Sequence, residues 1–481
     1  MRIVAPSRPG LEGRPTASLV MPNRILIVIT AAVALAHGCQ SPPPAPIDAA
    51  EQLDAFKRRP DAARGIATTG RVLDLEPTSI EPSDGLSLRE AEWIALVFNP
   101  SLRVARAEAG VTAARAEHAG LWPDPSIGLQ FSRLIDAADN PNELFGLLWF
   151  TIPVSGRLEA EVAVRGEEHR AALAEVQSLE WSTLCDLRAA WARWSTAAGT
   201  LEGASSQRAL LARADAAAAA LVDLGEAGQA DAAMQRATVA LAQADHAQLV
   251  TDEADAAATI LRLIGLPRPG ISLQSGAPIG PAPRISCSDT DELERRVLDE
   301  SPSIRAALVR YAVAEARLVL EVRRQYPDLQ VGPGFGQQDG FEQFQLGLNI
   351  PVPILNANRG GIAEAKAQRE LARAEVEALV TIATAEASEA CRRLSSARER
   401  RASLEASLLP SLDLQSDRLE RLVALGEVDP LQAATLASHA LSARVRWQRA
   451  TLDESLAAIE LSRIVGPPAS SNDRPAPEPL P

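Results

Sequence analysis

The chain has 481 residues, a formal net charge of −14 and an aromatic content of only 4%. The negative charge excludes a general nucleic-acid binder, because binding to phosphates requires a basic surface. The low aromatic content disfavours a compact globular enzyme with a thick core, and it favours helices that pack along narrow seams of small residues.

The N-terminal segment has the features of a bacterial export signal. An arginine precedes an apolar run over 25–36, whose length of about twelve residues suits a secretory signal and is too short to span a bilayer. Small residues then lead to Cys39, as in a bacterial lipobox. We expect residues 1–38 to be a signal peptide, with Met21 as an alternative start. Cys39 is expected to carry a lipid, and ordinary signal-peptidase cleavage nearby is the alternative.

The rest of the chain divides into two repeats between irregular ends. Residues 39–84 are predicted to form a lipid-anchored irregular tether, and the polar, proline-rich residues 467–481 a disordered tail. Ser87 is expected to cap an amphipathic helix with the sequence "LREAEWIALVF". The two repeats cover 85–270 and 271–466.

Each repeat contains a short alanine- and arginine-rich helix that ends at an aromatic residue followed by Pro-Asp. The first helix is predicted over 100–121, with Asn99 as its N-cap, and the second over 302–325. Pro123 and Pro327 terminate these helices, because proline lacks a backbone donor and clashes with the preceding turn.

Period-two alternation follows each short helix. The segments "SIGLQFSRL" and "FQLGLNIPV" alternate apolar residues with small or polar ones, which predicts strands with one apolar and one polar face. Their partner strands alternate less cleanly. The four strands are expected over 124–135, 144–154, 328–337 and 342–353.

A very long helix is predicted after each strand pair, over 158–222 and 361–424. At 1.5 Å per residue each would extend on the order of 100 Å, which indicates a coiled coil rather than a globular helix. Both end in a Leu-Gly-Glu turn, expected at about 223–229 and 424–430. Return helices are expected over 229–264 and 429–464. A return helix and a short helix together match one long helix in length, so the two can stack end to end beside it.

No arrangement of residues in the sequence indicates a catalytic or metal-binding site. The four cysteines do not indicate a disulfide framework in a chain of this length, and Cys185 and Cys391 are expected to be small packing residues within helices. The histidines show no metal-ligand spacing, and no nucleophile–base pair or phosphate-binding loop is visible. We therefore expect no metal, no cofactor and no enzymatic activity.

The strands indicate how chains assemble. A sheet that spans a membrane must be closed, because lipid cannot satisfy the hydrogen bonds of an open edge. Four strands per chain cannot close a barrel, whereas three chains would supply twelve, an even number within the range of outer-membrane barrels. The expected fold is mainly α with a small β part: long coiled-coil hairpins plus four strands per chain that contribute to a twelve-stranded trimeric outer-membrane β-barrel.

The order of these motifs resembles the TolC-like outer membrane efflux proteins over about 85–466. The resemblance rests on "NPSLRVARAEAGVTAARAEHAGLWPDP" and its second copy, on "IPVSGRLEAEVAVR" and "IPVPILNANRGGIAEAKAQRELARAEVEA" after the strands, and on "LVALGEVDPLQAATLASHAL" before the final helix. The lipobox-like start is most similar to the lipid-anchored, heavy-metal and multidrug efflux branch of that family.

The resemblance implies a homotrimer with its barrel in the outer membrane of a Gram-negative-type bacterium and its helical tunnel in the periplasm. It implies a passive exit duct in tripartite efflux or type I secretion. The implied partners are outer-membrane lipid, a periplasmic adaptor protein and an inner-membrane pump of the RND or related type. The alternative is a lipid-anchored periplasmic coiled-coil scaffold without a pore, which would have no reason to place amphipathic hairpins at the same end of both repeats.

The resemblance also implies roles for the two turns. The adaptor-contacting tip would comprise Leu224, Gly225, Glu226, Leu425, Gly426 and Glu427, and the alternative is that these are ordinary hairpin turns. An entrance gate would include Glu427, Asp429 and Gln432. The chain departs here from the carboxylate ring that narrows the TolC entrance, because 430–435 carries no acidic residue.

The strand–helix junctions are expected at positions that match between the repeats. These positions are Pro123, Pro153, Arg157, Pro327, Pro351 and Arg359. The two arginines either order the junctions or are simply solvated.

Overall fold

The computed structural model describes residues 43–60, 85–133, 142–225, 228–267, 271–274, 287, 289–338, 341–407 and 430–467. The chain divides into two units, Met1–Ala55 and Phe56–Pro481. The predicted signal peptide, Cys39 and the tail at 468–481 lie outside the described residues.

The segment expected to be an irregular tether contains a helix, α2 (Ala49–Lys57). Asp48 starts this helix, because its carboxylate accepts a hydrogen bond of 2.8 Å from the backbone N–H of Ala50. The following residues, "AAEQL", are strong helix formers. The expectation of irregular structure was therefore wrong for this part of the tether.

The second unit is built from long helices that follow the predicted order. The helices described are α4 (Leu88–Phe98), α5 (Pro100–Glu117), α6 (Arg157–Asp223), α7 (Gln229–Ile264), α8 (Thr290–Glu300), α9 (Pro302–Arg323), α10 (Arg359–Ser407) and α12 (Pro430–Val465). Most ends agree with the sequence-based bounds to within two residues. Helix α5 ends earlier than expected, and α8 was not predicted. The expected continuation of α10 over 408–424 lies outside the described residues.

The helix starts confirm the capping signals in the sequence. The Ser87 hydroxyl accepts from the backbone N–H of Glu90, and the Glu90 carboxylate accepts from the N–H of Ser87 at 2.8 Å, which completes a capping box. The Asn99 side chain accepts from the N–H of Leu102 at 3.1 Å, with Pro100 at the first helical position.

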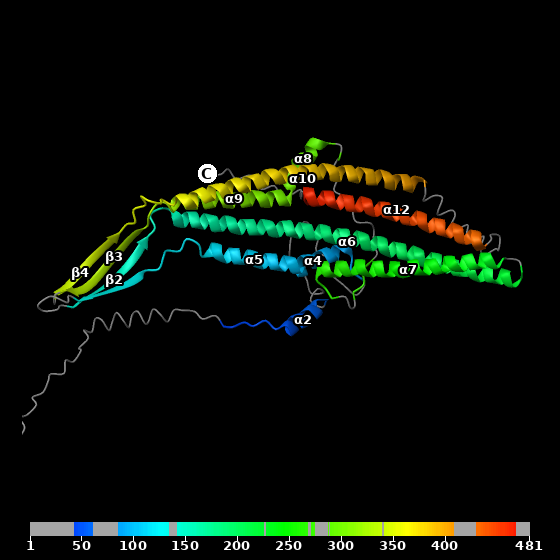
Figure 1. The fold of residues 1–481 in the computed structure, drawn as a ribbon, viewed down its shortest axis with the longest axis horizontal. Helices are drawn as coiled ribbons and strands as arrows, with labels where there is room; N and C mark the ends of the chain where they lie inside the picture. Colours follow the sequence, from blue (N-terminus) through cyan, green and yellow to red (C-terminus); the bar gives the residue numbers. More distant parts are fainter. Residues whose placement is uncertain are drawn as a thin grey trace, which may run out of the picture. The chain divides into compact units, whose positions relative to one another are not determined.

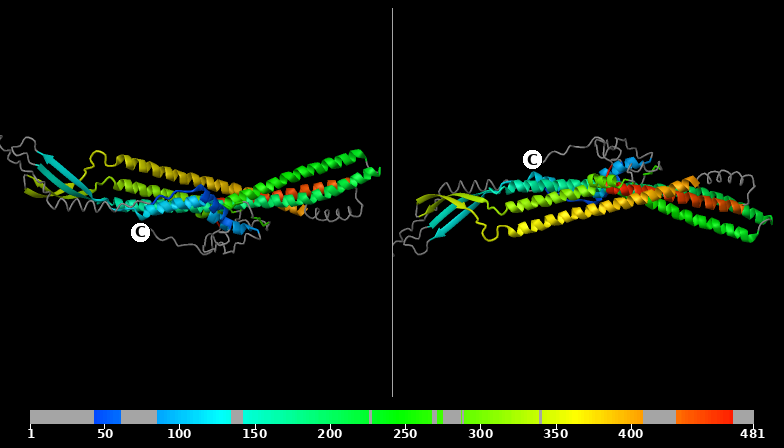
Figure 2. Two further views of the ribbon diagram at one scale, coloured as in Figure 1. Left: turned by 90° about the horizontal axis from the view of Figure 1, so that it is seen from below. Right: turned by 90° about the horizontal axis from the view of Figure 1, so that it is seen from above.

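Within this unit the helices form a wall in which shorter helices pack in pairs along longer ones. Helices α5 and α7 pack along one side of α6, whereas α9 and α12 pack between α6 and α10. Figures 1 and 2 show α9 and α12 following one another along α10, at positions that match α5 and α7 along α6. This is the end-to-end stacking that the helix lengths predicted.

Two apolar clusters lie where the short helices α4 and α8 pack on this wall. Trp93 and Ile94 of α4 are buried against Trp191 and Trp194 of α6, whose ring centroids lie 5.3 Å apart. Leu293, Val297, Ala387, Leu394 and Leu461 form the matching cluster of the second repeat around α8. The second cluster contains smaller side chains.

A disulfide bond between Cys287 and Cys391 fastens the second cluster. It joins the chain just before α8 to the middle of α10, with the two Cα atoms 5.4 Å apart. The expectation that Cys391 is a small packing residue was therefore wrong. Sequence spacing did not reveal the pair, because the two cysteines are 104 residues apart. Cys185 is unpaired and buried, as expected for a packing residue, and burial raises the pKa of its thiol to about 11.

The four strands form one antiparallel sheet in the order β1-β2-β3-β4. Their bounds are β1 (Ser126–Arg133), β2 (Asn142–Ile152), β3 (Leu329–Gln338) and β4 (Phe341–Asn349). Each predicted hairpin is present, and β2 also pairs with β3, so that the sheet joins the two repeats. The sheet lies at one end of the helices (Figure 2).

The uneven alternation of β2 and β3 has a single steric explanation. On one face of the sheet β2 carries Phe145, Leu147 and Trp149, and the neighbouring strands carry glycines beneath these side chains. A Cβ atom at Gly332 would lie 2.6 Å from the ring of Trp149, and one at Gly347 would lie 2.7 Å from it. The bulky residues of β2 therefore depend on missing side chains in β3 and β4.

Removing the disulfide with Cys287→Ser and Cys391→Ser should destabilise the protein by roughly 2–5 kcal/mol, since the bond closes a long loop in the unfolded chain. We expect a lower apparent melting temperature in a thermal scan. As an internal control, dithiothreitol should lower the melting temperature of the wild type to that of the double variant and leave the variant unchanged. A wild type that is insensitive to reductant would contradict this.

Gly332→Ala should destabilise the sheet by about 1–3 kcal/mol, because the new methyl group overlaps the Trp149 ring. Gly128→Ala is the matched control on the same face, where the new Cβ would lie 3.8 Å from the Trp149 Nε1 atom, an ordinary contact. Thermal scans in detergent should separate the two variants. Equal melting temperatures for both would show that the close approach at Gly332 has no energetic role.

Candidate functional site

The main candidate surface is an exposed apolar face of the sheet. Ladder pairs such as Ile127 with Leu148 and Phe335 with Phe344 place apolar side chains side by side on this face. Leu129 is 75% exposed, Phe335 70% and Leu346 65%. The face comprises Ile127, Leu129, Phe131, Leu144, Leu148, Phe150, Val331, Pro333, Phe335, Phe344, Leu346 and Leu348. An apolar face that covers all four strands of a sheet marks an interaction surface.

The opposite face of the sheet is largely polar or small. Ser132 donates a hydrogen bond of 2.8 Å to Glu143, and the Asn349 amide donates one of 2.9 Å to Gln330. The glycines and the bulky side chains of β2 occupy much of the remainder. The two faces therefore differ in polarity as the alternation in β1 and β4 predicted.

The sheet has two open edges among the described residues. Strand β1 pairs only with β2, and β4 pairs only with β3. Each edge therefore presents backbone N–H and C=O groups without a strand partner, which natural sheets cover, pair or protect with charge.

The junctions between sheet and helices lie where the sequence placed them. Pro123 and Pro327 lie between a short helix and a strand, and Pro153 and Pro351 lie between a strand and a long helix. Trp122 and Tyr326, which follow the ends of α5 and α9 and directly precede Pro123 and Pro327, are 64% and 55% exposed. Aromatic side chains therefore occupy equivalent exposed positions in both repeats, in the segments that lead into β1 and β3.

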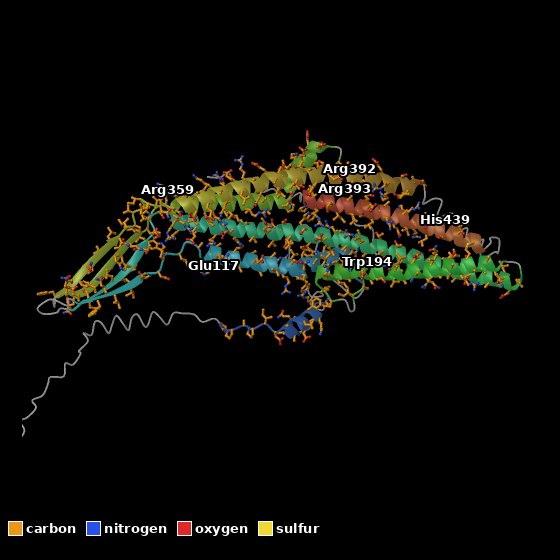
Figure 3. All side chains as sticks on the ribbon, viewed as in Figure 1. Glu117, Trp194, Arg359, Arg392, Arg393 and His439 are labelled. Atoms are coloured by element: carbon orange, nitrogen blue, oxygen red, sulfur yellow. A yellow bond between two sulfur atoms is a disulfide. The ribbon has the colours of Figure 1, made fainter. Side chains whose placement is uncertain are left out.

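The two junction arginines behave differently. Arg157, the first residue of α6, donates from Nε to Asp328 Oδ2 at 2.8 Å, with both side chains about three-quarters buried. This ion pair joins the end of the first strand pair to the start of the second. Arg359, the first residue of α10, makes no side-chain contact of this kind among the described residues and lies exposed at the sheet end of the helix (Figure 3).

Ion pairs also connect the long helices to each other. Glu168 of α6 accepts from Arg317 of α9 at 2.6 Å and from Arg165 at 2.8 Å. Burial acts to raise the pKa of Glu168, but the two arginines outweigh burial and hold that pKa below its usual value. Arg463 of α12 pairs with Asp186 of α6 at 2.6 Å. The second repeat is thus held to α6 by charge as well as by small apolar contacts.

The far end of the helices is a turn between α6 and α7. Gly225 has a left-handed backbone with φ of +75° and donates to Val222 O at 2.9 Å, while Leu224 is 72% exposed. The remaining predicted tip residues, Glu226, Leu425, Gly426 and Glu427, lie outside the described residues, as does Asp429. Gln432 lies within α12, but its side chain is not described.

The described residues contain no group of three or more His, Cys, Asp or Glu side chains arranged to hold a metal ion. Within the same residues, the helices lack any stretch that is both long and apolar enough to cross a membrane.

The functional feature that sequence reasoning missed is the Arg157–Asp328 pair. The repeated Pro-Asp motif was visible, but nothing in the sequence assigned its aspartate a partner.

The fold is that of known outer-membrane channels. The structure is similar to the outer-membrane channel OprN with a TM-score of 0.65 and 20% identity, covering 84% of this chain and 95% of that chain. It is similar to the Campylobacter jejuni CmeC outer membrane channel with a TM-score of 0.67 and 14% identity, covering 91% and 95%. For the open state of the Neisseria gonorrhoeae MtrE outer membrane channel the TM-score is 0.61 and the identity 17%, covering 83% and 95%.

No protein-family model and no curated protein matches the sequence. At this level of identity the structural similarity establishes the fold, which has the helical hairpins and the four-stranded sheet expected from the sequence.

Gly225→Val should weaken the α6–α7 turn by about 1–2 kcal/mol, because a left-handed backbone is unfavourable for a β-branched residue. Gly225→Asn should be nearly neutral, since asparagine tolerates this conformation and no atom lies within 4 Å of the added Cβ. Hydrogen exchange of the residues flanking the turn should be faster in the valine variant only. Similar exchange in both variants would indicate that the glycine conformation is not needed there.

Proposed function

We propose that the chain is the outer-membrane channel of a tripartite efflux or type I secretion system. Three copies would close a twelve-stranded barrel, and their helical hairpins would form a tunnel in the periplasm. The observation that carries this proposal is the four-stranded sheet, which combines an exposed apolar face with two open edges.

The dimensions of the sheet suit a bilayer. The strands have 8, 11, 10 and 9 residues, close to the 9–11 that a tilted strand needs to cross the hydrocarbon core. Because lipid offers no hydrogen bonds, the open edges of β1 and β4 would have to pair with further strands. Copies of the same chain would supply them and keep the apolar face outward.

The residues next to the sheet also fit a membrane boundary. Trp122 and Tyr326 are exposed at the helix–strand junctions, and aromatic residues form girdles at the interfaces of outer-membrane barrels. They would mark the periplasmic side of the barrel, from which the helices leave the membrane.

The helical part fits an oxidising, extracytoplasmic compartment. Disulfides persist in the bacterial periplasm and are rare in the cytoplasm, so the Cys287–Cys391 bond supports export of the chain. The apolar run over 25–36 would direct that export, and Cys39 would attach the mature N-terminus to lipid.

The exposed turn at the tip of the helices supports the proposed protein partners. Leu224 is exposed beside Gly225 at the end of the helical hairpin farthest from the sheet, where an apolar side chain is available for a protein contact. A periplasmic adaptor would contact this turn and its counterpart at Leu425, Gly426 and Glu427, and would connect the channel to an inner-membrane pump. In this arrangement the channel conducts cargo passively and performs no chemistry.

The test compares two neighbouring positions on opposite faces of β4. Leu346→Arg places a charge on the apolar face and should destabilise membrane insertion by about 2–4 kcal/mol at mid-bilayer. Gln345→Arg, on the other face, should leave insertion intact. We expect the wild type and the Gln345 variant to conduct in planar bilayers and the Leu346 variant not to conduct, whereas the proposed lipid on Cys39 would keep all three in the membrane fraction.

Two results would argue against the proposal. A pore would be contradicted if the wild type does not conduct and variants in which the charged tip residues Glu427 and Asp429 are replaced do not conduct either. Normal membrane insertion of the Leu346 variant would contradict a lipid-facing role for the apolar face, and would favour a periplasmic scaffold.

A further inference from the structure

We infer that Arg359 of one copy forms an ion pair with Asp124 of the next copy, and that this pair sets the register in which the sheets join. The inference rests on the proposed function, because it requires that copies assemble edge to edge. It adds a specific contact, on which assembly depends, to the general proposal of a closed ring.

The template for this contact lies within the chain. Where the first repeat meets the second, Arg157 at the start of α6 pairs with Asp328, which follows Pro327 just before β3. The pair is partly shielded, with exposed side-chain fractions of 24% and 22%. It lies beside the β2–β3 ladder that joins the two repeats, and it therefore fixes one end of that ladder.

Asp124 of the first repeat and Arg359 of the second, the counterparts of Asp328 and Arg157, are both unpaired among the described residues. Asp124 follows Pro123 just before β1, as Asp328 follows Pro327 before β3, and Arg359 begins α10, as Arg157 begins α6. Both side chains are exposed, and neither makes an ion pair or a side-chain hydrogen bond with any described residue. Both repeats therefore contain the arginine and the aspartate, but among the described residues only Arg157 and Asp328 are paired.

These two residues cannot satisfy each other within one copy. Asp124 leads into β1, Arg359 follows β4, and these strands are the opposite edges of the sheet. A second copy of the chain, placed with its β1 beside β4, is the partner that brings the two charges together. The junction of the second repeat is already ordered for this, because the Asn358 amide donates to Glu321 O at 2.8 Å and holds the backbone next to Arg359.

A separate alignment of the strand ends gives the strand register between copies, because Arg359 lies nine residues after Ile350 whereas Arg157 lies five after Ile152. Within the chain, Ile152 lies opposite Leu329 and Phe150 opposite Val331. The alignment uses the Ile-Pro-Val segments at the ends of β2 and β4 and the Pro-Asp motifs that precede β1 and β3. It places Leu348 opposite Ile127 of the next copy. This register keeps apolar side chains on the same face across the new edge.

Cross-linking of full-length protein in detergent tests the contact directly. Asp124→Cys combined with Arg359→Cys, treated with a short bismaleimide, should give dimer and trimer bands on a denaturing gel. Each single variant, and Asp124→Cys with Arg373→Cys farther along α10, should give monomer only. The native cysteines should not interfere, because Cys185 is buried, Cys287 and Cys391 are bonded to each other, and the proposed lipid would block the sulfur of Cys39.

Charge exchange provides the energetic test. Arg359→Asp and Asp124→Arg should each lower the apparent association constant about tenfold, and the double variant should recover most of that loss. The readout is the trimer fraction in native mass spectrometry over a dilution series. Arg157→Asp is the control, which should lower the thermal stability of the monomer because its pair is intramolecular.

The outcomes separate the two proposals. A conducting trimer without cross-links between 124 and 359, or without recovery in the double variant, would overturn the ion pair and leave the channel in place. A wild type that neither assembles nor conducts would overturn the channel and the ion pair together.

Discussion

The structure depends on the hydrogen-bonding requirement of an open sheet. Strands β1 and β4 each have one strand partner among the described residues, and the face they share is apolar and exposed. In water such a surface invites aggregation, and in lipid an unpaired edge costs several kcal/mol for each exposed backbone group. Under the proposed function both problems would have the same solution, which is closure with further copies in a membrane. In the described part of the chain, α10 packs mainly on α9 and α12, which separate it from α6.

The repeat explains how one chain supplies equivalent wall segments. Helices α9 and α12 pack between α6 and α10, as α5 and α7 pack along α6, so each repeat contributes one long helix and two shorter ones in line. The second repeat joins the first through the β2–β3 ladder, the Arg157–Asp328 pair and the ion pairs of Glu168 and Asp186. The junction that is built within the chain would provide the pattern for the proposed junction between copies.

The sequence predicted those parts of the fold that depend on local signals. Ser87 and Asn99 marked helix starts, Gly225 marked the turn, and alternation marked β1 and β4, because capping, backbone handedness and side-chain period act within a few residues. The disulfide and the Arg157–Asp328 pair could not be predicted, because each joins segments more than 100 residues apart. The weak alternation of β2 was not a defect of the pattern. It became interpretable only when the register placed Trp149 over glycines of the neighbouring strands.

The disulfide gives the structure a dependence on compartment. A reducing cytoplasm does not sustain such a bond, so before export α8 could make only noncovalent contacts with α10 and α12, such as the apolar cluster of Leu293, Val297 and Leu461. The covalent connection would then form after export, which keeps the chain easier to unfold while it must remain extended for translocation. The first repeat has no such bond among the described residues, and its cluster around α4 contains tryptophans where the cluster around α8 contains smaller side chains. The two repeats are therefore stabilised differently, the first by tryptophan packing around α4 and the second by a covalent bond that would form only in an oxidising compartment.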